Sequence, residues 1–113
     1  MTPRLASAVL VSALIRRAEA EGGFGAVMAK GDATAGSILV LLLEKGRNPR
    51  IFERILQADG HYSWAPSATR PGGKAEEVPE FIARRRRFDP DLWVLELDIP
   101  SGERFADEMN AIG

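Results

Sequence analysis

Four consecutive arginines, Arg84–Arg87, form the densest group of side chains in this sequence that could carry chemistry. A guanidinium group donates hydrogen bonds in a planar fork that matches the oxygens of phosphate and carboxylate groups. The run could therefore bind phosphate, in a nucleic acid or a nucleotide, or the acidic face of a protein. The alternative is that it forms the solvated end of a helix, because charge runs usually face solvent.

The four arginines cannot all point in one direction, because consecutive helical residues spread around most of the circumference. Arg84 and Arg87 are neighbours at i,i+3, and Glu80 can form an ion pair with Arg84 at i,i+4. Arg85 instead lies along the apolar stripe of the helix. This stripe consists of Phe81, Ile82 and Phe88. We therefore expect Arg85 either to snorkel to the surface or to be held by a carboxylate and backbone carbonyls.

Two carboxylates follow the arginines, Asp89 and Asp91, on either side of Pro90. Carboxylates that converge can bind a divalent cation or perform acid–base catalysis. The alternative function is therefore a small metal-assisted hydrolytic enzyme that uses Asp89 and Asp91 with Asp32 or Glu96. In the structural interpretation, Asp89 and Asp91 form a turn and cap backbone N–H groups. Convergence in a cleft would favour the enzyme, whereas turn capping or pairing with arginine would disfavour it.

Further basic and aromatic residues extend the candidate binding surface. Arg16 and Arg17 form a second basic pair, and Trp64 and Trp93 could offer stacking surfaces, although buried core positions are the common place for tryptophan. The candidate binding residues are Arg16, Arg17, Arg84, Arg85, Arg86, Arg87, Asp89, Asp91 and Trp93.

Several chemistries are excluded by residues that the sequence lacks. There is no cysteine, which excludes disulfides, thiolate zinc sites, iron–sulfur clusters and cysteine nucleophiles. The single histidine, His61, follows the hairpin signal Asp59-Gly60 and has the place of a polar turn residue. Neither Gly22-Gly23 nor Gly72-Gly73 matches a phosphate-binding loop, and Gly22-Gly23 is better explained as a helix C-cap. We expect no metal and no cofactor.

Length and charge point to one domain over residues 1–113. The 15 basic and 16 acidic residues give a net charge of −1, so the chain lacks the basic excess of proteins that coat nucleic acid or anionic membranes. The apolar run Leu5–Ile15 is too short to cross a bilayer, and Arg16 and Arg17 disfavour cleavage as a signal peptide. We therefore expect a cytoplasmic protein that does not bind membranes.

Hydrophobic periodicity predicts a helix over residues 6–21, although Leu5–Val11 could instead form a short strand. A second helix has Pro79 in its first turn and ends at Phe88-Asp89-Pro90. A final short helix could be formed by Phe105, Met109 and Ile112.

A period of two residues, typical of strands, begins after the first helix. Strands are predicted over residues 24–30, 37–43, 50–56, 61–64 and 92–99, with a turn over residues 44–49 and a surface loop over residues 65–75. The strand at Ser37–Leu43 is apolar throughout, which indicates a central position. Short connections between successive strands favour an antiparallel meander. The predicted fold class is α+β, with a mainly antiparallel sheet of about five strands, two covering helices and the order α-β-β-β-β-α-β.

Several motifs occur in the order of a known family. They are residues 12–19, Gly22-Gly23-Phe24, Lys30-Gly31-Asp32 with Ala35-Gly36, and residues 86–96. In these motifs the chain resembles the domain of unknown function 1491 family. The resemblance implies a stand-alone bacterial domain in the cytosol and carries no assigned activity or cofactor. Residues 47–74 match the family only in general character, so the resemblance assigns no role to His61 or Trp64.

These observations favour a small non-catalytic binding or interaction module. Its partner would be a phosphate-containing ligand or an acidic protein, bound through the arginines. An exposed strand edge would also allow pairing with a second copy of the chain.

Overall fold

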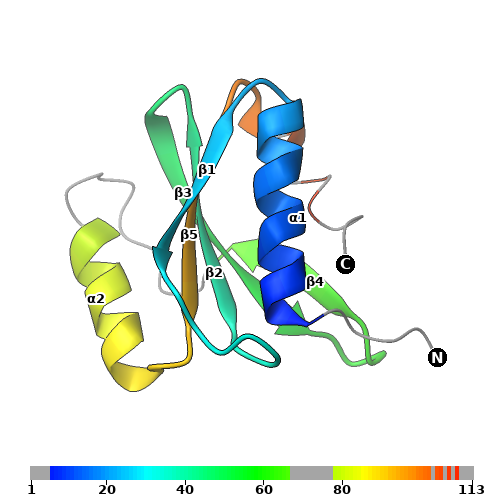
Figure 1. The fold of residues 1–113 in the computed structure, drawn as a ribbon, viewed down its shortest axis with the longest axis vertical. Helices are drawn as coiled ribbons and strands as arrows, with labels where there is room; N and C mark the ends of the chain where they lie inside the picture. Colours follow the sequence, from blue (N-terminus) through cyan, green and yellow to red (C-terminus); the bar gives the residue numbers. More distant parts are fainter. Residues whose placement is uncertain (1–5, 67–77, 103, 106, 108, 110–113) are drawn as a thin grey trace.

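The computed structural model describes residues 6–66, 78–102, 104, 105, 107 and 109. Two helices and five strands follow one another in the predicted order (Figure 1). The helices are α1 (Ser7–Ala20) and α2 (Val78–Phe88). The strands are β1 (Phe24–Ala29), β2 (Ile38–Glu44), β3 (Arg47–Leu56), β4 (Tyr62–Pro66) and β5 (Trp93–Ile99). The α+β fold class is confirmed.

The strands form one sheet in the order β1-β5-β2-β3-β4. Neighbouring strands are antiparallel except β2 and β5, which are parallel. The sheet is therefore mixed, and the predicted meander holds only from β2 to β4, because β5 lies between β1 and β2. Both β2 and β5 are mainly apolar and largely buried on both faces. Burial on both faces favours central positions, which explains why the last strand inserts here.

Helix α1 covers one face of the sheet (Figure 1). Its buried side chains, Leu10, Val11, Leu14 and Ala18, belong to one apolar cluster with residues of β2, β3, β4 and β5. The helix ends at Ala20, and Gly22, two residues later, has a φ of 89°. The N–H of Gly23 donates to the carbonyl of Ala18 at 2.9 Å. A Cβ on Gly23 would overlap the carbonyl oxygen of Asp98, so glycine allows the end of α1 to lie directly against β5. The predicted C-cap is confirmed.

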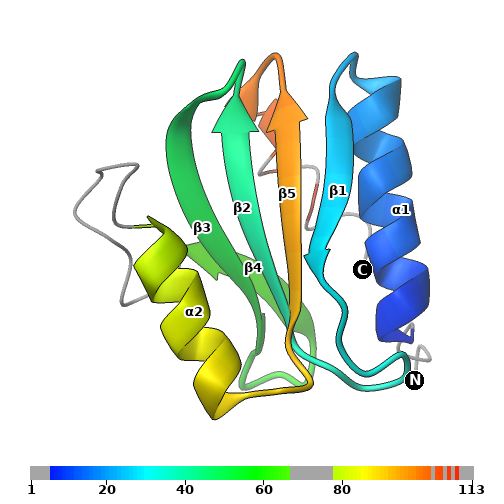
Figure 2. The same cartoon turned by 60° about the vertical axis from the view of Figure 1, so that its left-hand side comes forward.

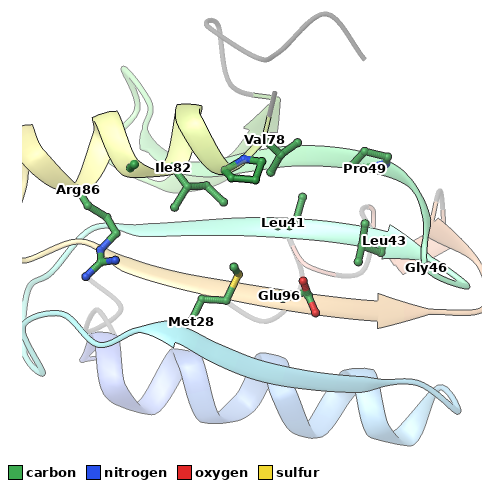
Figure 3. Close-up of a pocket in the computed structure, with 11 residues that line it drawn as sticks. Met28, Leu41, Leu43, Gly46, Pro49, Val78, Ile82, Arg86 and Glu96 are labelled. Atoms are coloured by element: carbon green, nitrogen blue, oxygen red, sulfur yellow. The ribbon is translucent and has the colours of Figure 1, made fainter. Parts of the chain in front are cut away.

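Helix α2 covers the opposite face, so the two helices lie on opposite sides of the sheet (Figure 2). Val78, Phe81 and Ile82 pack there against a second apolar cluster that includes residues of β2, β3 and β5. The helix lies beside β2 and β3 and leaves the edge strand β1 uncovered (Figure 3). On β1, Phe24 and Met28 are about half exposed. The predicted pairing with a second copy would use this edge.

The hairpins differ little from the prediction. The turn between β2 and β3 is shorter than expected, because Lys45 and Gly46 adopt positive φ values of 52° and 75° and β3 begins directly afterwards. Asp59-Gly60 forms the turn between β3 and β4, as predicted, with a φ of 88° at Gly60.

The remaining predictions concern the ends of elements. The segment for which a strand was the alternative is helical, because α1 begins at Ser7; Leu5 lies outside the described residues. Most of the predicted loop over residues 65–75 also lies outside them. Near the C-terminus, Phe105 and Met109 are helical and fully buried, whereas Ile112 lies outside the described residues. Among the helices described, none is long and apolar enough to cross a membrane.

Candidate functional site

Arg85 is the arginine of the run that the fold immobilises. Its guanidinium group forms an ion pair with the carboxylate of Glu53 on β3, and the two side chains are 28% and 23% exposed. A pair this far from bulk solvent is screened less than a surface pair. Of the two alternatives predicted for Arg85, snorkelling or being held by a carboxylate and backbone carbonyls, the structure shows a carboxylate partner, and the pair fixes α2 to the sheet.

The other three arginines are exposed to solvent. Within the described part of the chain, Arg84, Arg86 and Arg87 have no ion-pair partner. The predicted ion pair between Glu80 and Arg84 does not form. Arg84 and Arg87 lie one turn apart on the side of α2 that faces away from the sheet, and like charges at this spacing repel one another. Among the described residues, a carboxylate therefore neutralises the positive charge of the run only at Arg85.

Phe88 departs most clearly from the sequence prediction. It was expected in the apolar stripe of α2 but is 82% exposed, so this prediction is wrong. The helix ends at Phe88, and Leu92 enters the apolar core in its place, at 2% exposure. On the helix, Phe88 lies one turn beyond Arg84, and Arg84 is also a neighbour of Arg87 at i,i+3. We call Arg84, Arg87 and Phe88 the α2 outer surface.

A groove of about 450 Å³ lies between α2 and the sheet (Figure 3). Its apolar lining includes Met28, Leu41, Leu43, Val78 and Ile82. Arg86 extends from α2 at one end, and Glu96 projects from β5 at some distance along the groove (Figure 3). The sequence did not predict this groove, because it depends on how far α2 extends over the sheet.

Two of the carboxylates considered for the alternative enzyme, Asp32 and Asp89, accept hydrogen bonds from nearby backbone N–H groups. The side chain of Asp32 accepts hydrogen bonds from the backbone N–H groups of Thr34 and Ala35, at 3.2 and 2.8 Å. The side chain of Asp89 accepts the N–H of Asp91 at 3.1 Å. Both carboxylates therefore cap turns, as in the structural interpretation. In the described ranges, no three metal-ligating side chains gather at one point.

Trp93 has a structural position. Its side chain is 5% exposed, and its indole N–H donates to the carbonyl oxygen of Asp32 at 2.7 Å. Trp64 is buried in the core beneath α1. Neither tryptophan offers a free face for stacking, in agreement with the expectation of core positions.

The second basic pair is separated from the first. Arg16 and Arg17 are exposed on α1, which covers the opposite face of the sheet from α2. The two groups of arginines therefore face different sides of the molecule, and a compact ligand on α2 does not reach Arg16 or Arg17. The two groups form candidate surfaces that must be tested separately.

His61 has a role in its hairpin. It is exposed, and its backbone N–H donates to the carboxylate of Asp59 at 3.0 Å, with the ring nitrogen Nδ1 3.5 Å from the same carboxylate. The backbone hydrogen bond from His61, and to a smaller extent the charge of its ring, lowers the pKa of Asp59. This arrangement is that of a capped turn, as expected for His61.

Comparison with known proteins assigns the family. The model of the family described as a protein of unknown function (DUF1491) matches residues 5–107. The chain belongs to the DUF1491 family. A search of curated proteins finds no match.

Solved structures of other bacterial proteins are similar over nearly the whole chain. A crystal structure of a DUF1491 family protein from Caulobacter crescentus CB15 is 34% identical, with a TM-score of 0.80, and the match covers 90% of this chain and 94% of that chain. An NMR structure of a DUF1491 family protein from the same bacterium is 33% identical, with a TM-score of 0.77 and coverage of 92% and 94%. A solution structure of the A. tumefaciens protein Atu0922 is 34% identical, with a TM-score of 0.73 and coverage of 88% and 89%.

The DUF1491 motifs around residue 31 meet those around residue 91 in the structure. The backbones of Gly31 and Gly36 approach the carbonyl oxygen of Asp91 so closely that a Cβ on either glycine would overlap it. The backbone N–H of Asp32 donates to the same oxygen at 3.1 Å, and Trp93 bonds to the Asp32 carbonyl. These contacts hold the β1–β2 connection against the start of β5. The motifs in this region therefore have a structural explanation.

Proposed function

We propose that this protein is a small binding module whose ligand carries phosphate groups and contacts the arginines of α2. The observation that supports the proposal most strongly is the contrast within the run. Arg85 is paired with Glu53, whereas Arg84, Arg86 and Arg87 are exposed and have no carboxylate partner in the described part of the chain. If the arginines served only to fix the helix to the sheet, Arg85 would be sufficient and the other three would not be needed.

The exposed arginines have an energetic cost that a ligand would offset. Two like charges one helical turn apart destabilise a helix by about 0.2–0.5 kcal/mol. An anion placed between Arg84 and Arg87 would replace this repulsion with charge-assisted hydrogen bonds, each worth about 1.5–3 kcal/mol. Because the Arg85–Glu53 pair already fixes α2, the helix need not be ordered on binding, and the remaining entropy cost is that of the arginine side chains themselves.

The net charge of −1 is compatible with a local anion site. At physiological ionic strength, charges are screened over about 8 Å, so a ligand on α2 responds mainly to charges near it. Glu80 is the carboxylate on the same side of α2, one turn before Arg84. It would weaken the attraction of the α2 outer surface for anions, so we expect moderate affinity and strong dependence on salt.

Titration calorimetry with tripolyphosphate tests the proposal. The variant Arg84→Ala/Arg87→Ala removes two charges from α2, and Arg16→Ala/Arg17→Ala removes two from α1 on the opposite face. We expect the α2 variant to bind at least about tenfold more weakly, since one lost charge-assisted hydrogen bond already accounts for that factor. The α1 variant should bind like the wild type. Equal losses in both variants, or no binding by the wild type, would contradict the proposal.

Compartment is part of the same proposal. We place the module in the cytoplasm, where phosphate-containing ligands are abundant and where a chain without cysteine needs no oxidising conditions. The carboxylates Asp32 and Asp89 have no part in the proposed site, because turn capping already accounts for their positions.

A further inference from the structure

We infer that the phosphate-containing partner is a single-stranded nucleic acid, with one base stacked on Phe88 and the adjoining phosphates bound by Arg84 and Arg87. The inference rests on the proposed function and specifies its ligand. Its starting point is that Phe88 is 82% exposed at the end of the helix that carries the arginines.

The exposure of Phe88 has no explanation in the packing of the described residues. Phe88 belongs to neither apolar cluster, and Leu92 fills the core position beside α2. A large apolar side chain that stays in water forgoes the stabilisation that burial gives. An aromatic ring exposed in this way is available to a partner, and aromatic residues are enriched where proteins bind one.

The placement of the ring relative to the charges indicates the ligand. Phe88 lies four residues after Arg84, which makes their side chains neighbours on the helix surface, and Arg84 in turn neighbours Arg87 at i,i+3. The aromatic ring therefore lies at one end of a short row that continues with two guanidinium groups. A single-stranded nucleic acid alternates flat bases with phosphates. Stacking of bases on aromatic side chains, together with basic groups that follow the backbone, is how proteins bind such strands without reading their sequence.

Other anionic partners match the surface less well. A duplex keeps its bases stacked inside and presents mainly phosphates to a convex helix, so the ring of Phe88 would find no base to stack on. An acidic peptide offers carboxylates to Arg84 and Arg87 but need not offer a flat ring for Phe88. The exposed aromatic therefore favours a single strand over both.

A second exposed phenylalanine provides a matched control. Phe24 on β1 is 54% exposed and lies on a strand that carries no charged residue. If any exposed phenylalanine could bind bases, Phe24 and Phe88 would contribute alike. If the neighbouring arginines are required, only Phe88 contributes. Phe24→Leu and Phe88→Leu make the same chemical change at both places.

Fluorescence polarisation with labelled oligouridylate, and with an abasic oligomer of the same length, tests the inference. We expect the wild type to bind oligouridylate about tenfold more tightly than the abasic oligomer, as stacking of one base allows. Phe88→Leu should lose this preference and keep its affinity for the abasic oligomer, while Phe24→Leu should keep both. Arg84→Ala/Arg87→Ala should weaken binding of both oligomers and reduce the slope of log affinity against log salt. Unchanged thermal unfolding of Phe88→Leu would show that its fold is intact.

The outcomes separate this inference from the proposed function. Equal binding of oligouridylate and the abasic oligomer, unchanged in Phe88→Leu, would overturn the stacking role and leave the phosphate site standing. Loss of the base preference in Phe24→Leu as well as in Phe88→Leu would also overturn it. Absence of binding to both oligomers and to tripolyphosphate would overturn both, as would binding of polyglutamate alone, which would identify an acidic protein as the partner.

Discussion

Removal of the Arg85 side chain should destabilise the fold, whereas removal of its neighbours should not. Arg85 pairs with Glu53, and both side chains are about three-quarters buried. Exposed ion pairs contribute about 0–1 kcal/mol, whereas breaking a fully buried pair costs about 3–5 kcal/mol. For this partly exposed pair we expect Arg85→Ala to lower the free energy of unfolding by about 1–2 kcal/mol. Arg84→Ala should change it by less than about 0.5 kcal/mol.

Urea denaturation of a double-mutant cycle would measure this pair. Arg85→Ala, Glu53→Gln and the double variant isolate the coupling between the two side chains from the other contacts of each. We expect a coupling energy of about 1 kcal/mol and a decrease of about 4–8 °C in the unfolding midpoint of Arg85→Ala. A coupling energy near zero, or an equal loss of stability in Arg84→Ala, would refute the view that one arginine fixes α2 and the others are free to bind.

Three further predictions concern the scaffold and one turn. Gly23→Ala should lower the free energy of unfolding by about 3 kcal/mol or more, because its Cβ would overlap the backbone of β5. Gly60→Ala should lower it by only about 1 kcal/mol, because the positive φ of Gly60 disfavours alanine but the space around it is open. Equal losses of stability in thermal unfolding would contradict this prediction. Ser7→Ala should lower the free energy of unfolding by about 1–2 kcal/mol, because the buried hydroxyl donates to the carbonyl of Gly36 at 2.6 Å. An unchanged unfolding midpoint would contradict this prediction. The pKa of Asp59 should lie below 3.8 in an NMR titration, so the small stabilisation that this carboxylate provides is present above that pH and is lost as the pH falls through the lower folded-state value. A pKa at or above 3.8 would show that the hydrogen bond from His61 is absent in solution.

Local signals in the sequence predicted most elements of the fold. The helical stripe of α1 and its double-glycine end, the apolar strand β2 and the Asp59-Gly60 turn each follow from short-range chemistry, and the structure confirms them. The position of β5 could not be read in this way. It depends on which strands are buried on both faces once the helices are packed, and that competition acts over the whole chain.

The candidate site was predicted in part. The sequence placed Arg85 on the apolar stripe of α2 and left two alternatives for it, snorkelling or a carboxylate partner, and Glu53 provides the carboxylate. The same helical pattern placed Phe88 in the core, because periodicity alone does not say where a helix extends past the sheet. The separation of Arg16 and Arg17 from the arginines of α2 was also invisible, since it depends on which face of the sheet each helix covers.

The most direct test of the proposed binding surface is an NMR map of the backbone amides that shift when tripolyphosphate or oligouridylate is added. Related proteins of this family have been solved by NMR, so the measurement suits a chain of this size. We predict that the largest shifts lie in residues 84–88 at the end of α2 and that Arg84→Ala/Arg87→Ala abolishes them. Shifts centred on Arg16 and Arg17 in α1, or no shifts at ligand concentrations well above those of the calorimetry, would contradict the assignment of α2 as the binding surface.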